Sequence, residues 1–315
     1  MKAAVVREFG DPTVLRSETW TDPVPGAGQV RIVVGAAGTN PVDTAIRRDG
    51  AWAGVRLPWI PGFEVAGTVD RVGKDAKGLA VGDRVVGMTN FFREGGGYAE
   101  LTVLDAEEAV VLPTGVSFVA ACAIPLAGGT AWDLLNRLNL SEGARLLVLG
   151  ASGGVGSYLL QLAKHRGITV VAVGRPEHFA RMRRLGAVEC LDYGSEKQRH
   201  TAQEIPGGSV AAIADLVGEG AAASWLQTLG HGGQIASTEP PELDLGTLVD
   251  TNLTWHGVLL THSGTRTRSL VELLGTGTLV SHVPHVFPLS RADEAHRLLE
   301  TRHAGGKVVL VPPPF

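Results

Sequence analysis

The sequence predicts an α/β protein with two domains: a small β-rich domain, and a parallel sheet of six strands with helices on both faces. Its 315 residues, 44% of them hydrophobic, are enough for two buried cores. Short β-rich segments separated by glycines fill the chain up to about residue 120. Beyond residue 140, apolar strands alternate with amphipathic helices, which is the pattern of a doubly wound parallel sheet.

In the first part, the expected strands are bounded by turn residues. Residues 29–34 and 65–72 are β-rich, and the turn residues at 81–84 lead into a further strand. Closely spaced short strands of this kind favour a barrel-like β domain. The chain has 42 glycines, nearly twice the usual share of about 7%, and many of them separate these strands.

The second part carries six expected strands and the helices between them. The strands are expected at residues 145–149, 168–173, 188–191, 210–216, 234–237 and 253–259, and the helices at 157–166, 177–185 and 221–229. Six strands complete a dinucleotide-binding sheet. The remaining elements, at 269–274, 285–289, 291–300 and 307–311, are therefore expected to return to the first domain. The predicted domains are 1–122 with 264–315, and 123–263.

Composition excludes several classes of function. A net charge of −4 argues against nucleic acid or an anionic membrane as the main partner. The two cysteines, Cys122 and Cys190, cannot make a disulfide framework, which indicates a reducing compartment. The N-terminus reaches charged residues before an apolar core of signal-peptide length could form, and no segment approaches the roughly 18 uninterrupted apolar residues of a membrane span. A cytoplasmic protein with a small-molecule substrate is expected.

The strongest local motif is a glycine-rich loop after the strand at 145–149. The residues Gly150-Ala151-Ser152-Gly153-Gly154-Val155-Gly156 stand between this apolar strand and a predicted helix. Without side chains at Gly153 and Gly156, the backbone could approach a pyrophosphate at the helix N-terminus. The strand–loop–helix context therefore predicts a dinucleotide site.

The end of the next strand indicates which dinucleotide is bound. An acidic residue there binds the ribose 2′-hydroxyl of NAD, whereas an arginine suits the 2′-phosphate of NADP. The sequence has Gly174 followed by Arg175. NADP(H) is therefore expected, with the alternative that Arg175 is a solvated loop residue and the protein accepts either cofactor.

The first part of the chain lacks the usual ligands of zinc. The first cysteine is Cys122 and the first histidine is His165. Zinc is bound by thiolate, imidazole or carboxylate groups, so neither a catalytic zinc nor a four-cysteine zinc site can be assembled there. The reaction is expected to proceed without the Lewis acid that a metal would supply.

Short motifs stand in order along the whole chain. They are Gly38-Thr39-Asn40-Pro41-Val42-Asp43-Thr44, Pro61-Gly62-Phe63-Glu64-Val65-Ala66-Gly67, Val81-Gly82-Asp83-Arg84-Val85, Gly96-Gly97-Tyr98-Ala99-Glu100, Gly129-Thr130-Ala131-Trp132, the glycine loop, Ala295-His296-Arg297-Leu298-Leu299-Glu300 and Gly306-Lys307-Val308-Val309-Leu310. The ordered set resembles the zinc-independent quinone oxidoreductases, the ζ-crystallin-like group of the medium-chain dehydrogenase/reductase superfamily. The resemblance implies a GroES-like β-barrel catalytic domain followed by a Rossmann domain.

The resemblance also implies roles for particular residues. Asn40 and Phe63 stand where zinc-dependent relatives have a cysteine and a histidine ligand. Asn40 would be a polar donor near the nicotinamide, or only the cap of the turn before Pro41. His178 stands where relatives have a lysine, which would weaken a phosphate contact at neutral pH. The implied cofactor-binding residues are Thr130, Ser152, Gly153, Gly154, Val155, Gly174, Arg175, His178, Tyr193, Val217 and Lys307.

The implied activity is NADPH-dependent reduction of quinones or other conjugated carbonyls by hydride transfer without metal. The candidate catalytic residues are Asn40, Asp43 and Thr130, and the substrate pocket would be lined by Asn40, Phe91 and Phe92. Family members often have a tyrosine where this chain has Ala45, so no side chain is assigned as proton donor. Two alternatives remain: an enoyl reductase acting on enoyl thioesters, and a non-catalytic NADPH-binding protein of the ζ-crystallin-like type.

The expected last strand of the parallel sheet, at 253–259, would lie at the sheet edge. Exposed edges pair with other chains. A homodimer through this strand, Leu253 to Leu259, is expected, as in the relatives.

Overall fold

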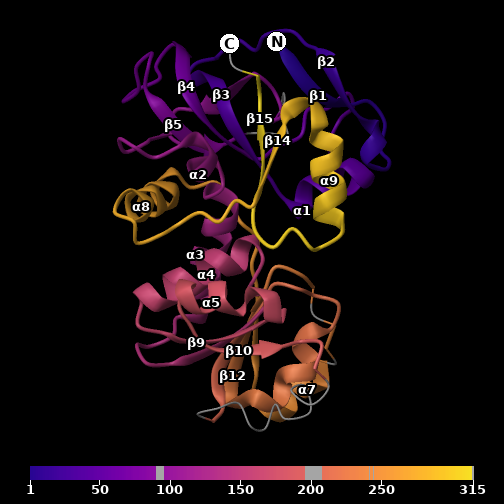
Figure 1. Ribbon diagram of the computed structural model, residues 1–315, viewed down its shortest axis with the longest axis vertical. Helices are drawn as coiled ribbons and strands as arrows, with labels where there is room; N and C mark the ends of the chain where they lie inside the picture. Colours follow the sequence, from indigo (N-terminus) through magenta and orange to yellow (C-terminus); the bar gives the residue numbers. More distant parts are fainter. Residues whose placement is uncertain (90–95, 196–207, 241, 244, 314–315) are drawn as a thin grey trace. The chain divides into compact units, whose positions relative to one another are not determined.

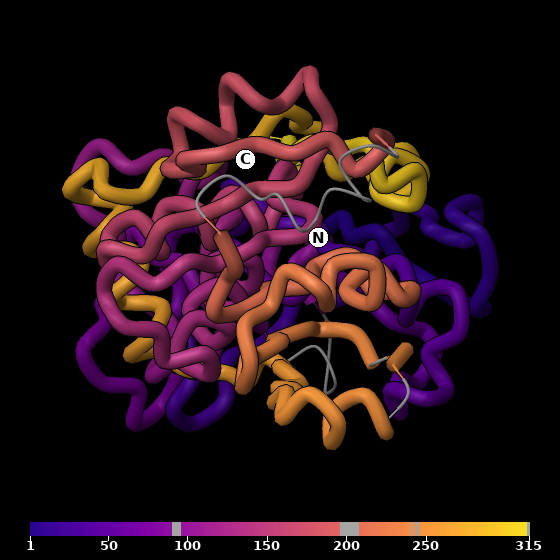
Figure 2. The backbone as a smooth tube through the Cα atoms, turned by 90° about the horizontal axis from the view of Figure 1, so that it is seen from below, coloured from indigo at the N-terminus to yellow at the C-terminus, as the bar shows by residue number. Residues whose placement is uncertain are grey.

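The computed structural model describes residues 1–89, 96–195, 208–240, 242–243 and 245–313, and the others are drawn in grey in Figures 1 and 2. Contacts divide the chain into two compact units. Unit 1 comprises Met1–Leu126 and His262–Phe315, and unit 2 comprises Ala127–Thr261. The C-terminal segment therefore folds with the N-terminal one. No helix among the described residues is both long and apolar enough to cross a membrane.

Unit 1 is organised around a mostly antiparallel sheet in which the long strand β3 pairs on both sides. In Figure 1 the yellow strand β15 lies between the yellow β14 and the indigo β3, although β3 is far from both in the sequence. In spatial order the strands are β14 (His285–Pro288), β15 (Val308–Val311), β3 (Gln29–Thr39), β4 (Glu64–Val72), β5 (Arg84–Met88) and β7 (Val110–Val111). Strand β6 (Leu101–Asp105) also pairs with β3. Strands β1 (Lys2–Val6) and β2 (Leu15–Thr19) form a separate sheet of two strands.

Four α-helices accompany this sheet: α1 (Pro41–Arg48), α2 (Phe118–Cys122), α8 (Gly264–Gly275) and α9 (Ala292–Glu300). Helices α1 and α2 differ from the sequence prediction, which places only strands before about residue 120. Pro41 at the first helical position is a helix-start signal that was available. Helix α8 begins before the predicted residue 269, because the Ser263 side chain accepts a hydrogen bond from the backbone N–H of Arg266 and caps the helix.

Unit 2 is the predicted doubly wound parallel sheet of six strands. Their order is β10 (Ala187–Asp192), β9 (Thr169–Gly174), β8 (Arg145–Leu149), β11 (Val210–Asp215), β12 (Leu229–Ser237) and β13 (Thr254–Gly257), all parallel. The chain winds from β8 to one side and then returns to the other side at β11. This reversal is the topological switch point at which such sheets bind ligands.

Both faces of the sheet in unit 2 are covered, since the neighbouring residues Leu146 and Leu147 of β8 point to opposite faces and are both buried. Helices α4 (Gly154–His165) and α5 (Phe179–Leu185) contact each other and strands β9 and β10. The helix predicted at 221–229 is a 3-10 helix over Ala221–Thr228, and it packs Trp225 into the core of the sheet. The described residues of this unit also form a 3-10 helix at Pro176–His178, helix α7 (Leu245–Thr251) and most of α3 (Pro125–Leu138).

Candidate functional site

The glycine loop of unit 2 joins β8 directly to α4. Gly150 has a left-handed backbone, with φ of +75°, which turns the chain away from the strand. A Cβ atom at Gly156 would lie 2.6 Å from the carbonyl oxygens of Gly150 and Ala151. Only glycine therefore lets the first turn of α4 pack on the end of β8, with its free backbone N–H groups exposed to an anion. This arrangement fits the pyrophosphate of a dinucleotide.

Several predicted cofactor residues of unit 2 come directly after a strand. They lie along one edge of the sheet, because parallel strands end on the same side. Gly174 and Arg175 stand at the end of β9, and Tyr193 follows β10. The Arg175 Nε donates a hydrogen bond of 2.9 Å to the Tyr193 hydroxyl, and both side chains are accessible to solvent. These two groups form a polar pair that suits a phosphate on the adenosine ribose.

The turn after β11 borders the glycine loop. The buried Asp215 carboxylate accepts hydrogen bonds from the backbone N–H groups of Val217, at 2.9 Å, and Gly218, at 3.1 Å. A Cβ atom at Gly150 would lie 3.1 Å from Val217 Cγ2, so this turn packs against the loop. Thr130, a further candidate in unit 2, is buried on α3.

Sequence reasoning missed Arg181 on α5. Its guanidinium donates to the Ser152 carbonyl at 3.0 Å and to the Ser157 hydroxyl at 3.3 Å, and so ties α5 to the glycine loop. Burial, and then the charge of Arg181, lower the pKa of His178 and so favour its neutral form. Arg181 follows His178 by three residues, and helical spacing could have placed both on the same side.

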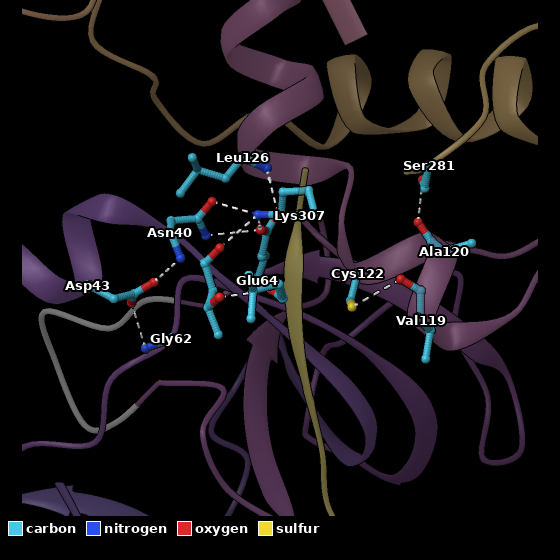
Figure 3. Close-up of polar contacts among 12 residues, drawn as sticks. Asn40, Asp43, Gly62, Glu64, Val119, Ala120, Cys122, Leu126, Ser281 and Lys307 are labelled. Atoms are coloured by element: carbon cyan, nitrogen blue, oxygen red, sulfur yellow. Dashed lines mark hydrogen bonds and ion pairs between the residues drawn. The ribbon is translucent and has the colours of Figure 1, made fainter. Parts of the chain in front are cut away.

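Unit 1 contains a buried polar cluster of Asn40, Glu64 and Lys307 (Figure 3). The Lys307 ammonium donates to Glu64 Oε1 at 2.6 Å, to Asn40 Oδ1 at 2.6 Å and to the Thr39 carbonyl at 3.1 Å. Asn40 Nδ2 donates to the same Glu64 Oε1 at 2.9 Å. The three side chains thus form a closed ring of hydrogen bonds around an ion pair.

Glu64 extends this cluster to the start of α3. Its second oxygen, Oε2, accepts a hydrogen bond of 2.7 Å from the backbone N–H of Leu126. A carboxylate at a helix N-terminus also interacts favourably with the helix dipole. Gly38 is required nearby, because a Cβ atom there would overlap Glu64 Oε1 and the Cys122 carbonyl.

Asp43 lies one helical turn beyond Asn40 and holds the turn that carries it. Its carboxylate accepts hydrogen bonds from the backbone N–H groups of Asn40, at 2.8 Å, and of Gly62, at 3.0 Å. Burial raises the pKa of Asp43 to about 7, against the lowering effect of these hydrogen bonds. Asn40 is also the N-cap residue of α1.

The structure thus brings Asn40 and Asp43 together in unit 1, with Glu64 as a third member. Lys307, named among the expected cofactor-binding residues, belongs to unit 1 and lies in this cluster. Phe91 and Phe92 lie outside the described residues. Among the side chains that the structure describes, no group of three or more His, Cys, Asp and Glu could hold a metal ion.

Comparisons with known proteins agree with this architecture. Residues 26–114 match the alcohol dehydrogenase GroES-like domain, and residues 185–310 match a model described as zinc-binding dehydrogenase. The NADPH-dependent alkenal/one oxidoreductase of Arabidopsis thaliana is 33% identical over 100% of this chain and 80% of its own length. The quinone oxidoreductase of Sus scrofa is 30% identical over 99% and 98% of the two chains.

A solved structure shows the same fold with the expected cofactor. The quinone oxidoreductase of Escherichia coli, complexed with NADPH, has a TM-score of 0.90 and 27% identity, covering 99% of this chain and 100% of that one. The motif order predicted this relationship. The chain belongs to the zinc-independent quinone oxidoreductase family of the medium-chain dehydrogenase/reductase superfamily.

Proposed function

We propose that this protein is an NADPH-dependent reductase of quinones and other conjugated carbonyls, such as enones and enals. The observation that carries the proposal is the glycine loop packed against β8, with Arg175 and Tyr193 at the end of the neighbouring strands. Relatives named as quinone oxidoreductases and as an NADPH-dependent alkenal/one oxidoreductase support the substrate class.

The residues of unit 2 would hold the cofactor. The backbone from Ser152 to Val155 would bind the pyrophosphate, Arg175 and Tyr193 the 2′-phosphate, and Val217 the adenine side, with Thr130 at the nicotinamide end. Bound NADPH supplies the hydride. Asn40 would donate a hydrogen bond to the substrate, while Asp43 and Glu64 keep the turn that carries Asn40 in place. Such a site works mainly by positioning, so no titratable side chain needs to be essential.

The activity is tested by adding NADPH to purified protein with 1,2- and 1,4-quinones, short enals and enones, and enoyl thioesters. Oxidation of NADPH by a quinone, enone or enal is expected. Activity with enoyl thioesters alone would place the protein among the enoyl reductases. Tight NADPH binding with no oxidation by any of these compounds would show a non-catalytic binding protein.

Arg175 is expected to set the preference for NADPH. Arg175→Ala should weaken NADPH binding by about tenfold or more, since a charge-assisted hydrogen bond is worth about 1.5–3 kcal/mol. The Kd for NADH should stay the same, and both are measured by nicotinamide fluorescence. Arg184→Ala, which removes an exposed arginine of α5, serves as the control. An unchanged ratio of the two Kd values would assign Arg175 to the solvent.

The proposed protein is a cytoplasmic homodimer that pairs through β13. This strand has one neighbour, β12, in the order of the sheet, and Leu259 just after it is exposed. An unpaired strand edge with an apolar neighbour is a surface on which a second copy can add its own strand. Neither the small net charge nor the described helices favour nucleic acid or a membrane as partner.

Light scattering at micromolar concentration is expected to give the mass of a dimer. A proline at Trp255, in the middle of β13, should convert it to a monomer because proline cannot donate to a strand ladder. Val24→Pro, at an exposed site in unit 1, serves as the control for the introduction of a proline. Leu248→Pro is not a suitable control, because it would disturb helix α7. A monomeric wild type would contradict the proposal.

A further inference from the structure

The donor capacity of the Asn40–Glu64–Lys307 cluster is almost fully used within the cluster itself. A lysine ammonium has three N–H donors, and those of Lys307 are taken by Glu64, Asn40 and the Thr39 carbonyl. Lys307 is only 4% exposed. It therefore has no N–H left for a cofactor phosphate or a substrate, although the sequence suggested a cofactor contact.

The same contacts fix the orientation of the Asn40 amide. Oδ1 faces the ammonium of Lys307, and Nδ2 faces the carboxylate of Glu64 (Figure 3). Rotation of the amide by half a turn would set donor against donor and acceptor against acceptor. In a buried site such mismatches cost the full penalty of unpaired polar groups. The ion pair therefore holds the amide in one of its two orientations.

Among the hydrogen bonds of the described residues, one donor of the cluster is left over. An amide nitrogen carries two hydrogens, and Asn40 Nδ2 gives one to Glu64. Because Lys307 and Glu64 fix the amide, the direction of the second N–H is fixed as well. We propose that Lys307 and Glu64 are positioning residues that aim the second Nδ2–H of Asn40 as the hydrogen-bond donor for the substrate carbonyl oxygen.

This inference rests on the proposed function. When a hydride adds to a conjugated carbonyl, an electron pair moves onto the carbonyl oxygen, and solvent later supplies the proton. A fixed donor at that oxygen stabilises the developing negative charge more than it stabilises the bound substrate. Lys307 and Glu64 would then act on turnover through Asn40, and not by touching substrate or cofactor.

A double-mutant cycle on kcat tests this coupling. Asn40→Ala and Asn40→Asp, which both lack the donor, should each lower kcat by about 10²-fold or more. Lys307→Met should lower kcat by about tenfold or more in the wild-type background and by less than about threefold in the Asn40→Ala background. The Kd for NADPH should change by less than about twofold in the Lys307 variants. Lys74→Met, which removes an exposed lysine of unit 1, is the control.

If Lys307→Met does not fold, the cycle is run with Lys307→Arg and Glu64→Gln. Lys307→Arg keeps the positive charge of the lysine, and Glu64→Gln keeps the shape of the glutamate side chain. Additive losses of kcat would overturn the inference. A Kd for NADPH raised tenfold with kcat intact would also overturn it and would return Lys307 to the cofactor site. An inactive wild type would instead remove the proposed function on which the inference rests. The two failures are therefore distinguished by the wild-type assay alone.

Discussion

Replacing Glu64 by leucine is expected to lower the free energy of unfolding by about 3–5 kcal/mol. The buried ammonium of Lys307 would lose its counter-charge, and the Leu126 N–H would lose its acceptor. Removing one partner of a buried ion pair is costly because the other charge stays out of water without compensation. Urea denaturation at fixed protein concentration measures the loss.

Two further variants show whether burial is the cause. In the double variant Glu64→Leu with Lys307→Met, much of the stability should return, since no unpaired charge remains in the core. Glu294→Leu breaks the ion pair between Glu294 and Arg291 at the start of α9. The side chain of Glu294 is 37% exposed and that of Arg291 is 54% exposed. It should cost far less than Glu64→Leu, because water and salt screen an exposed pair. Equal losses for Glu64→Leu and Glu294→Leu would contradict the account of the buried cluster.

Strands with a continuous apolar run could be predicted closely from the sequence. Strand β8 has the predicted bounds, because Arg145–Leu149 is an apolar run that ends at a glycine. Strand β13 was expected to be longer than it is, and α4 starts three residues earlier than predicted. Where an element ends in glycine or polar residues, tertiary packing decides its exact boundary. Local sequence patterns carry no information about that packing.

The cluster in unit 1 could not be derived from local patterns. Lys307 and Glu64 are 243 residues apart, and they meet because β15 pairs with β3, with Val308 opposite Thr39. The motif order identified both residues as family features but left their contacts open. Arg181 was missed for a related reason, since its contact with Ser152 spans 29 residues and depends on how α5 packs beside the glycine loop.

The second large effect expected is a stability difference that depends on pH and comes from Asp43. Its pKa is about 7 in the folded protein and 3.8 in its ordinary state. A carboxyl group whose folded pKa is raised binds its proton more tightly when folded, so its contribution to stability is complete below pH 4 and is lost as pH rises to 7. At about 1.4 kcal/mol per pKa unit, the loss is of the order of 4 kcal/mol.

Asp43→Asn isolates this contribution because an amide does not titrate. Burial lowers the pKa of His296 to about 3, and this group acts in the opposite direction, since the unfolded state gains a proton below pH 6.5. The wild-type profile alone therefore mixes both effects. The difference between wild type and variant removes the His296 contribution to the extent that the two groups are independent. The two groups are linked through Tyr98, whose hydroxyl interacts with Asp43 and contacts His296 Nε2 at 3.1 Å.

At pH 5, Asp43→Asn should be less stable than wild type by about 1–3 kcal/mol, since an amide nitrogen cannot accept the backbone N–H that a carboxyl oxygen accepts. At pH 8 the order should reverse or the gap should close, because the wild type then buries a charge and the variant does not. Urea denaturation at both pH values measures the change, with Asp250→Asn on α7 as an exposed control. A difference that stays constant from pH 5 to pH 8 would mean that Asp43 keeps its charge throughout, held by the N–H groups of Asn40 and Gly62 against the cost of burial.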